Sequence, residues 1–374
     1  MTILTNLATR FCWALHRMNV DRLQYMRPFA PYENRRRLLL ITEPHRISHS
    51  QIFPFFFYHR ELFERFRIEL REVSSIDYMR LLESAPGRAD IVCLQTRFDI
   101  AELRLKEILL AIRKKNPDAK IVYLDSFAPL DLRLAVVVND HIDLYVKKHV
   151  FRDRTQYLRS TMGDTNLAEY YGGLYGFEYK KTTHVIPDGF LKKLVVGPSF
   201  LTSIEMLPYF SSYSSPCSLP RRLDIHGRLS FKGSDWYQSM RENAIAAMDS
   251  MHDVTVISSA GVGRRKYIRE LRSSKICFSP FGYGEVSWRD YEAIMCGSLL
   301  LKPDMSHVEV DPDIFVPYKT YVPVQWDFSD FQEKAKAFLK NEVARQEIAQ
   351  CAYKVLHDYA KNRRFLEQMK PVLS

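Results

Sequence analysis

The stretch SPFGYGEVSWRDYEAIMCGSLLLKPD, residues 279–304, decides the fold. An apolar strand leads into a loop in which Gly282 and Gly284 permit a sharp turn and close approach of the backbone. After this loop we expect a helix at about 287–296 and a second apolar strand at 298–302. A buried strand, a glycine loop, a helix and another buried strand form one unit of a parallel sheet that helices cover.

The start of the predicted helix carries the chemistry. Ser287 stands at the N-cap with Asp290 three residues later, a capping box, and Gly297 ends the helix. Free backbone N–H groups at the carboxyl end of a parallel strand hold phosphates. Arg289 suits bidentate phosphate contact, and Glu292, one turn further on, suits ribose hydroxyls. Taken singly, these residues also fit a routine cap and a surface ion pair; together they predict a site for a phosphorylated ligand.

The same alternation of strand and helix extends in both directions along the chain. The N-terminal half shows strand-like runs at 37–42, 90–95, 121–125 and 142–146, with a helical stretch at 100–115. A second series follows, with strands at 223–226, 254–258 and 275–279, helices at about 237–251 and 264–273, and an amphipathic helical tail from Phe328. This order predicts the α/β class, with two Rossmann-like, doubly wound domains facing across a cleft and helices at the C-terminus.

Length and turn formers set the expected domain bounds. A chain of 374 residues exceeds a typical single core, so two domains are expected. The stretch before the second series is dense in Gly, Ser, Pro and Tyr. We therefore predict an N-terminal domain at 1–195, a linker at 196–222 and a C-terminal domain at 223–374.

Composition narrows the class of protein. The net charge of +10 favours anionic partners, and seven arginines fall within residues 1–40. The six cysteines are scattered without a disulfide or zinc framework, which favours a reducing compartment. No apolar run reaches the roughly 18 residues of a membrane span, and no signal-peptide pattern is seen. We expect a cytoplasmic protein.

The N-terminal residues leave membrane contact open. Leu4, Leu7, Phe11, Leu15 and Met18 recur at helical spacing with arginines between them. Such a helix either lies on an anionic membrane surface, as a peripheral protein would, or packs on its own domain.

The run from 279 to 304 resembles the C-terminal signature of exostosin-like and related glycosyltransferases of the GT-B fold, in which G-x-G-E-x-S-x-R-x-x-E-A-x-x-x-G forms the donor-nucleotide site. The resemblance implies that Ser287 and Arg289 meet the diphosphate of a nucleotide sugar and that Glu292 meets its ribose. It places Glu285 near the sugar or the loop, next to Gly282 and Gly284. At the opening of the second domain it makes Arg228 and Lys232 candidates for the diphosphate, although Arg228 also fits a solvated loop.

The same resemblance implies a glycosyltransferase that moves a sugar, from a UDP- or GDP-linked donor, to a glycan or glycolipid acceptor. Retaining enzymes of the broader fold often have two glutamates with seven residues between them, whereas Glu285 and Glu292 have six between. We therefore infer neither retention nor inversion at the anomeric carbon.

Two requirements of the reaction point to further residues. A helix N-terminus with basic side chains can stabilise the departing diphosphate without a metal, so we expect metal independence and no cofactor besides the nucleotide sugar. For the base that deprotonates the acceptor, the candidates are Asp125, at the carboxyl end of a buried strand, and His45. Asp125 is also placed to cap a turn.

Two other readings compete. The charge and the aromatic content suit a nucleic-acid-binding protein, but acidic residues are mixed with the basic ones and no nucleic-acid motif is present, so we expect no nucleic-acid partner. A non-catalytic nucleotide-binding or membrane-associated module of the same fold would keep the phosphate loop and need no base.

Overall fold

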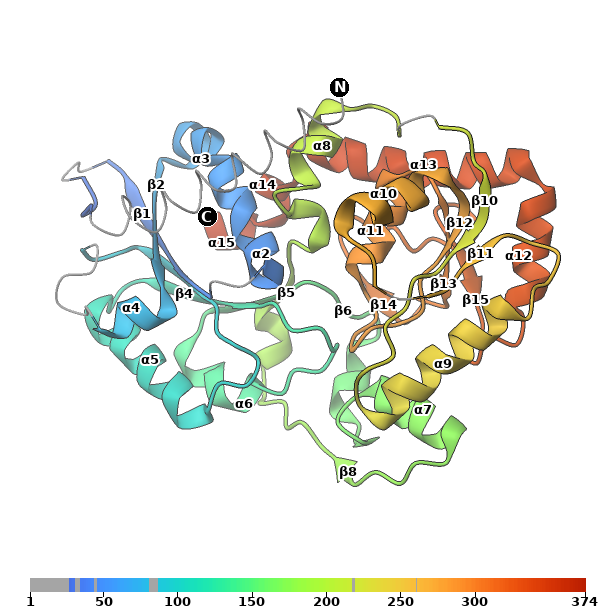
Figure 1. Ribbon diagram of the computed structural model, residues 1–374. Coiled ribbons are helices and arrows are strands. Elements are labelled where there is room, and N and C mark those ends of the chain that lie inside the picture. Colours follow the sequence, from blue (N-terminus) through green and yellow to red (C-terminus); the bar gives the residue numbers. More distant parts are fainter. Residues whose placement is uncertain (1–26, 31–33, 44–45, 81–86, 217–218, 260) are drawn as a thin grey trace.

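The computed structural model describes residues 27–374 except 31–33, 44–45, 81–86, 217–218 and 260. The predicted helix near residues 4–18 and the candidate base His45 lie outside the described residues. Two α/β bodies stand side by side, each built around its own parallel sheet (Figure 1).

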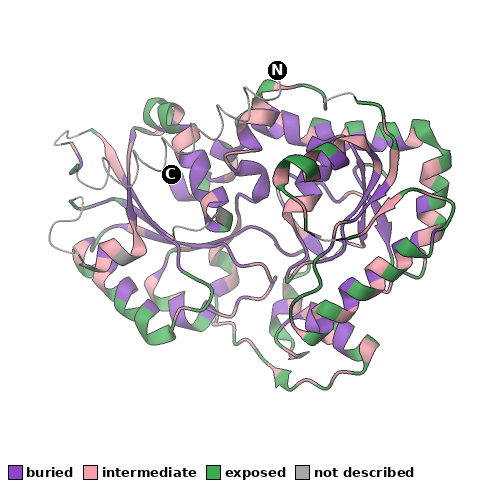
Figure 2. Ribbon diagram, viewed as in Figure 1, coloured by how far each residue is buried: buried purple, intermediate pink, exposed green. Residues whose placement is uncertain are grey.

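The first body is a six-stranded parallel sheet in the order β2-β1-β3-β4-β5-β9. Its central strands β3 and β4 are buried along nearly their whole length because helices cover both faces, and they lie in the purple core of Figure 2. Its strands are β1 (Arg36–Thr42), β2 (Ile68–Ser74), β3 (Ile91–Leu94), β4 (Lys120–Asp125), β5 (Leu144–Lys147) and β9 (Leu194–Val196), and its helices are α2 (Arg46–Phe57), α3 (His59–Phe66), α4 (Ser75–Arg80), α5 (Glu102–Lys115) and α6 (Ala135–Val138).

The second body is a five-stranded parallel sheet in the order β11-β10-β12-β13-β15. It contains the glycine loop and the helix after it. Its elements are β10 (Leu223–His226), α9 (Asp235–Asp249), β11 (Val256–Ile257), α10 (Arg264–Ser273), β12 (Ser274–Phe278), α11 (Trp288–Met295), β13 (Leu299–Pro303), β15 (Val322–Val324) and α12 (Phe331–Lys340).

The chain between β5 and β9 leaves the first body and packs on the second. β6 (Val150–Phe151) pairs antiparallel with β14 (Val308–Glu309), and the hydroxyl of Tyr171 in α7 (Asn166–Tyr175) donates to the carbonyl of Trp326 at 2.9 Å. In Figure 1, α7 lies against α9 at the lower edge of the molecule. The remaining short elements are β7 (Thr161–Met162), β8 (Lys181–Thr182), α8 (Leu207–Ser212) and the 3-10 turns η2 (Asn139–His141), η3 (Arg154–Leu158), η4 (Phe190–Lys193) and η5 (Phe200–Thr202).

The C-terminal helices return to the first body. The long helix α13 (Glu342–Lys361) runs along the second body, and α14 (Arg364–Gln368) and α15 (Lys370–Leu373) end near α2 in Figure 1. Phe365 packs edge-on against Phe55, with ring centroids 5.1 Å apart, and the Lys120 ammonium donates to the carbonyl of Pro371 at 3.1 Å. The last helices therefore fasten the two bodies together.

The predicted α/β class with two parallel sheets and closing helices is confirmed. The capping box at Ser287 and the left-handed Gly297, with φ of 68°, are also as predicted. Three strands of the two parallel sheets were missed, β2, β9 and β15, and two of them have a visible reason. β2 contains Glu69, Arg71 and Glu72 and lies at the edge of its sheet, and β15 contains a proline. Among the described residues, no helix is both long and apolar enough to cross a membrane.

Phe365→Ala tests the fastening of the tail. Phe365 is fully buried, so removal of its ring should lower the free energy of unfolding by about 3–5 kcal/mol in urea denaturation. Val343→Ala on α13, where Val343 is 67% exposed, is the control and should change it by less than about 0.5 kcal/mol. If both variants lowered the free energy of unfolding by the same small amount, the tail would not hold the two bodies together.

Candidate functional site

The N-terminus of α11 is held rigidly by hydrogen bonds around one carboxylate. The backbone N–H of Ser287 donates to Asp290 Oδ2 at 2.8 Å, and the hydroxyl of Ser279 donates to Asp290 Oδ1 at 2.6 Å. The buried ammonium of Lys302 lies 3.1 Å from the same carboxylate. The end of β12, the start of α11 and β13 are thus joined, and the first turn of α11 keeps a fixed direction.

A pocket of about 500 Å³ opens in front of this helix end. A second hollow of about 340 Å³ shares Arg241, Val262, Tyr267 and Arg289 with it, so the two form one concave surface. The first pocket is lined by Arg241, Val262, Arg264, Tyr267, Ser287, Trp288, Arg289 and Glu292.

Two arginines give this surface its charge. Arg241 is 6% exposed, and its guanidinium donates to the carbonyl of Phe281. Arg289 is partly exposed and donates to the carbonyl of Arg228. Burial, and then the nearby charge of Arg289, lower the pKa of Arg241 to about 10. Within the part of the chain that the structure describes, neither arginine forms an ion pair with a carboxylate.

The carboxylates beside the pocket already have partners. Asp290 pairs with Lys302, Glu292 pairs with Arg264, and Glu270 pairs with Arg228. The positive charge of Arg241 and Arg289 is therefore not neutralised by the protein. Such a pair of cations at a helix N-terminus suits a ligand with two negative charges.

Glu292 lines the pocket. The sequence left open a surface ion pair between Glu292 and Arg289, and the structure does not form it. Glu292 forms an ion pair with Arg264, whose other amino group lies 2.6 Å from Glu205. Arg264 thus donates to Oε1 of Glu292.

The two basic candidates near the start of the second body differ. The Arg228 guanidinium donates to both carboxylate oxygens of Glu270, at 2.6 and 3.0 Å, and to the carbonyl of Ser259 at 2.6 Å. Arg228 lines the smaller hollow, but its charge is already paired with the carboxylate of Glu270. Lys232 is exposed and lines neither hollow.

One of the two loop glycines, Gly284, serves the contact between the two bodies. A Cβ on Gly284 would lie 1.8 Å from the carbonyl oxygen of Ala128, a residue of the first body. Gly282 has its nearest such neighbour at 3.5 Å. Neither glycine lines the pocket, so the close approach that Gly284 permits is to protein backbone.

Glu285 is fully buried at the same contact and does not line the pocket either. Its carboxylate accepts from the amide of Asn166 at 2.8 Å and lies 3.9 Å from His149 and 3.7 Å from His307. Glu285 therefore lies where residues of both halves of the chain meet.

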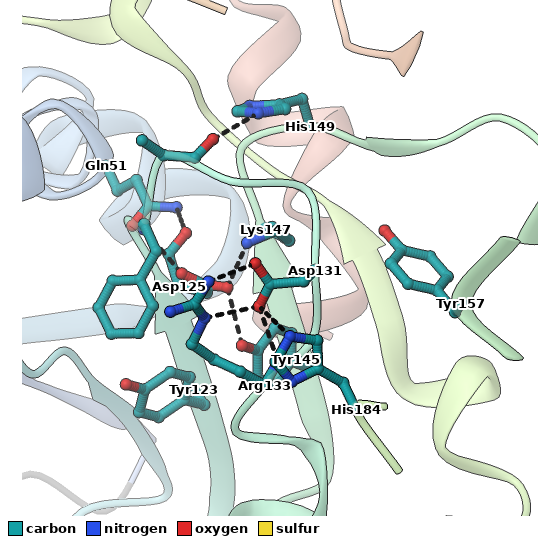
Figure 3. Close-up of polar contacts among 12 residues, drawn as sticks. Gln51, Tyr123, Asp125, Asp131, Arg133, Tyr145, Lys147, His149, Tyr157 and His184 are labelled. Carbon is teal, nitrogen blue, oxygen red and sulfur yellow. Dashed lines mark hydrogen bonds and ion pairs between the residues drawn. The ribbon is translucent and has the colours of Figure 1, made fainter. Parts of the chain in front are cut away.

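Asp125 lies in a buried polar network, shown in Figure 3. Its Oδ2 accepts from Lys147 at 2.6 Å and from the hydroxyl of Tyr145 at 2.8 Å, and its Oδ1 accepts from the N–H of Phe127 at 2.7 Å. Asp125 is 1% exposed and lines neither hollow. These contacts favour a structural role, so its predicted role as the base finds no support in its surroundings. His45 lies outside the described residues.

Sequence reasoning missed Arg241, Arg264, Tyr267 and Trp288. A signal for Arg241 was present: Trp236, Met240, Ala244 and Met248 recur every four residues in α9 and are buried. Arg241 follows Met240 on this apolar side of the helix, where a charged residue needs a reason.

Comparison with known proteins relates part of the chain to one family and the whole chain to one fold. Residues 217–370 match the family model described as glycosyl transferase-like. A glycosyltransferase from Rickettsia africae ESF-5 shares the fold, with a TM-score of 0.50 and 11% identity over 91% of this chain and 99% of that one. An alpha-glucosyltransferase in complex with UDP and a 13-mer DNA containing a HMU base gives the same four values. No curated protein matches the sequence.

The fold is therefore the two-domain GT-B fold, and its C-terminal half carries a glycosyl transferase-like domain. The exostosin-like subtype stays a prediction.

Gly284→Ala tests the contact between the bodies. The added methyl group would overlap the Ala128 carbonyl, so we expect the free energy of unfolding to fall by about 3 kcal/mol in chemical denaturation. Gly282→Ala, two residues away with room for a methyl group, should be nearly neutral. If both variants behave alike, the loop does not meet the first body as closely as described.

Asp125→Asn separates structure from catalysis. Removing the charge leaves the buried Lys147 ammonium unpaired, so stability should fall by about 3–5 kcal/mol. The double variant Asp125→Leu/Lys147→Met should recover most of that loss, as urea denaturation would measure. A stable Asp125→Asn protein without sugar-transfer activity would instead restore Asp125 as the base.

Proposed function

We propose that this protein is a glycosyltransferase that binds a nucleotide sugar at the N-terminus of α11 and transfers the sugar to a glycan or glycolipid acceptor. The observation that carries the proposal is the unneutralised pair Arg241 and Arg289 in the pocket at this helix end. The glycosyl transferase-like match over residues 217–370 supports it. The UDP in one structure of the same fold supports a nucleoside diphosphate donor, UDP- or GDP-linked.

The pocket residues suggest how the donor is held. The diphosphate lies against the free N–H groups of α11, with Arg241 and Arg289 on either side, and Ser287 at the cap. As the bond between the anomeric carbon and the phosphate oxygen breaks, negative charge grows on the diphosphate, and fixed guanidinium groups stabilise it. Glu292, one turn along α11, and its partner Arg264 of α10 line the same pocket and would meet the ribose.

We propose that the transfer needs no metal ion. Two arginines and a helix end supply positive charge where a divalent cation would otherwise neutralise the diphosphate. Nucleotide release in the presence of EDTA tests this point directly, and loss of release that added Mg²⁺ or Mn²⁺ restores would contradict it.

For the acceptor we propose a class of molecule, and for the catalytic base a single candidate residue. Membrane glycolipids and glycans suit the net charge of +10, and a DNA oligonucleotide belongs in the acceptor panel because one similar structure contains DNA. His45 is still a candidate base. The non-catalytic module predicts nucleotide binding without turnover toward any acceptor in such a panel.

Replacement of the two unpaired arginines tests the donor site. In a thermal shift panel of UDP-, GDP-, CMP- and ADP-sugars, we expect at least one nucleotide sugar to raise the Tm of the wild-type protein. Arg289→Met and Arg241→Met should each weaken that binding by about tenfold to a hundredfold, because each removes one charge-assisted contact to phosphate.

The matched control is Arg265→Met, which removes an exposed arginine of α10 that does not line the pocket. The affinity of this variant for the nucleotide sugar should equal that of the wild-type protein. The donor site would be wrong if no nucleotide shifts the wild-type Tm, or if the control and the pocket variants lose affinity equally.

A further inference from the structure

The described residues include three fully buried lysines near the contact between the two bodies. Lys147 pairs with Asp125 at 2.6 Å, and Lys302 pairs with Asp290 at 3.1 Å. Lys148, which is 1% exposed, has no hydrogen-bond partner for its ammonium group among the described residues. An unpaired buried amine is costly to keep, so its position calls for a partner that the protein itself does not supply.

The amine of Lys148 lies near the donor pocket. It stands 4.6 Å from the ring centroid of Phe200, and the ring of Phe200 packs on Trp288 at 4.7 Å. Trp288 is the first residue of α11 and lines the pocket. One aromatic ring therefore separates the amine from a residue of the pocket wall.

A second set of contacts leads to the same place. The imidazole of His149, next in the chain, lies 3.9 Å from the carboxylate of Glu285, two residues before the cap Ser287. Gly284 meets the backbone of Ala128 in the same region. The end of β5 thus faces the N-terminal end of α11 across the contact between the bodies.

We propose that Lys148 is the cation that the first body contributes to the donor site, where its ammonium group binds the diphosphate of the nucleotide sugar together with Arg241 and Arg289. This inference rests on the proposed function. A lysine suits the task because its flexible four-carbon stem lets the amine leave the ring of Phe200 and reach the ligand. The donor would then contact both bodies at once.

The charges around Lys148 make this binding sensitive to pH. Burial, and then the charge of Lys147, lower the pKa of Lys148 to about 7, and Asp125 opposes this shift. His149, the next residue in the chain, has its pKa lowered by burial and by the charges of Lys148 and Lys147, so its imidazole stays neutral. A bound diphosphate favours the charged amine, so the pKa of Lys148 rises on binding and the protein takes up a proton. Affinity should therefore fall as the pH rises above 7.

Calorimetry with UDP-glucose and GDP-mannose tests the proposal, because their diphosphate diesters do not titrate near neutral pH. Titrations at pH 8 in two buffers of different ionisation enthalpy give the number of protons taken up. We expect close to one proton for the wild-type protein and none for Lys148→Met, with an affinity about tenfold weaker in the variant. Lys192→Met, an exposed lysine in η4, is the control and should match the wild-type protein.

The thermal stability of the free protein adds a second readout. Lys148→Met removes a buried, unpaired amine and keeps its length, so its Tm should rise while donor affinity falls. Unchanged affinity and proton uptake in Lys148→Met would overturn the inference and leave the proposed function intact. A lower kcat in Lys148→Met at unchanged donor affinity would also overturn the inference. The amine would then act as the base that deprotonates the acceptor. Absence of nucleotide binding by the wild-type protein would overturn the proposed function itself.

Discussion

Positive charge without a carboxylate to match it is the constraint around which the site is built. Asp290 is the acidic residue nearest the start of α11, yet Ser279, the Ser287 N–H and Lys302 hold it on the protein side of the helix. Glu292 and Glu270 likewise have their own cations. This separation leaves Arg241 and Arg289 in the pocket wall without a carboxylate partner, which is the arrangement that the proposed anionic ligand would complete.

The contact between the two bodies places this charge beside the first sheet. Gly284 allows the glycine loop to touch the backbone at Ala128, and the chain after β5 crosses to pair β6 with β14. The C-terminal helices return in the other direction, with Phe365 on Phe55. Because the chain crosses more than once, the mutual position of the two bodies depends on several contacts, and the loop before α11 makes one of them.

Local rules predicted the parts of the site that depend on local sequence. The strand, the glycine loop, the capping box at Ser287 and the terminal Gly297 follow from residues within one stretch of chain. Lys148 could not be assigned in this way, because its importance comes from a partner that it lacks in three dimensions. Arg241 had only the indirect signal of a charged residue on the apolar side of a helix. Asp125 shows the converse: a carboxylate at a strand end suggested a base, whereas Lys147, in the neighbouring strand, binds it.

The comparison of the three buried lysines shows why pairing carries more information than burial. Burial alone would make Lys147, Lys148 and Lys302 equal candidates for a functional role. Two of them lie within 3.1 Å of a carboxylate and so join neighbouring elements of the fold. A charge that the fold neutralises internally contributes little attraction to a ligand, whereas an unneutralised one in the same low-dielectric surroundings attracts an anion strongly. This contrast is the reason why the residues proposed to bind the donor are those whose charge the folded protein leaves without a counter-ion.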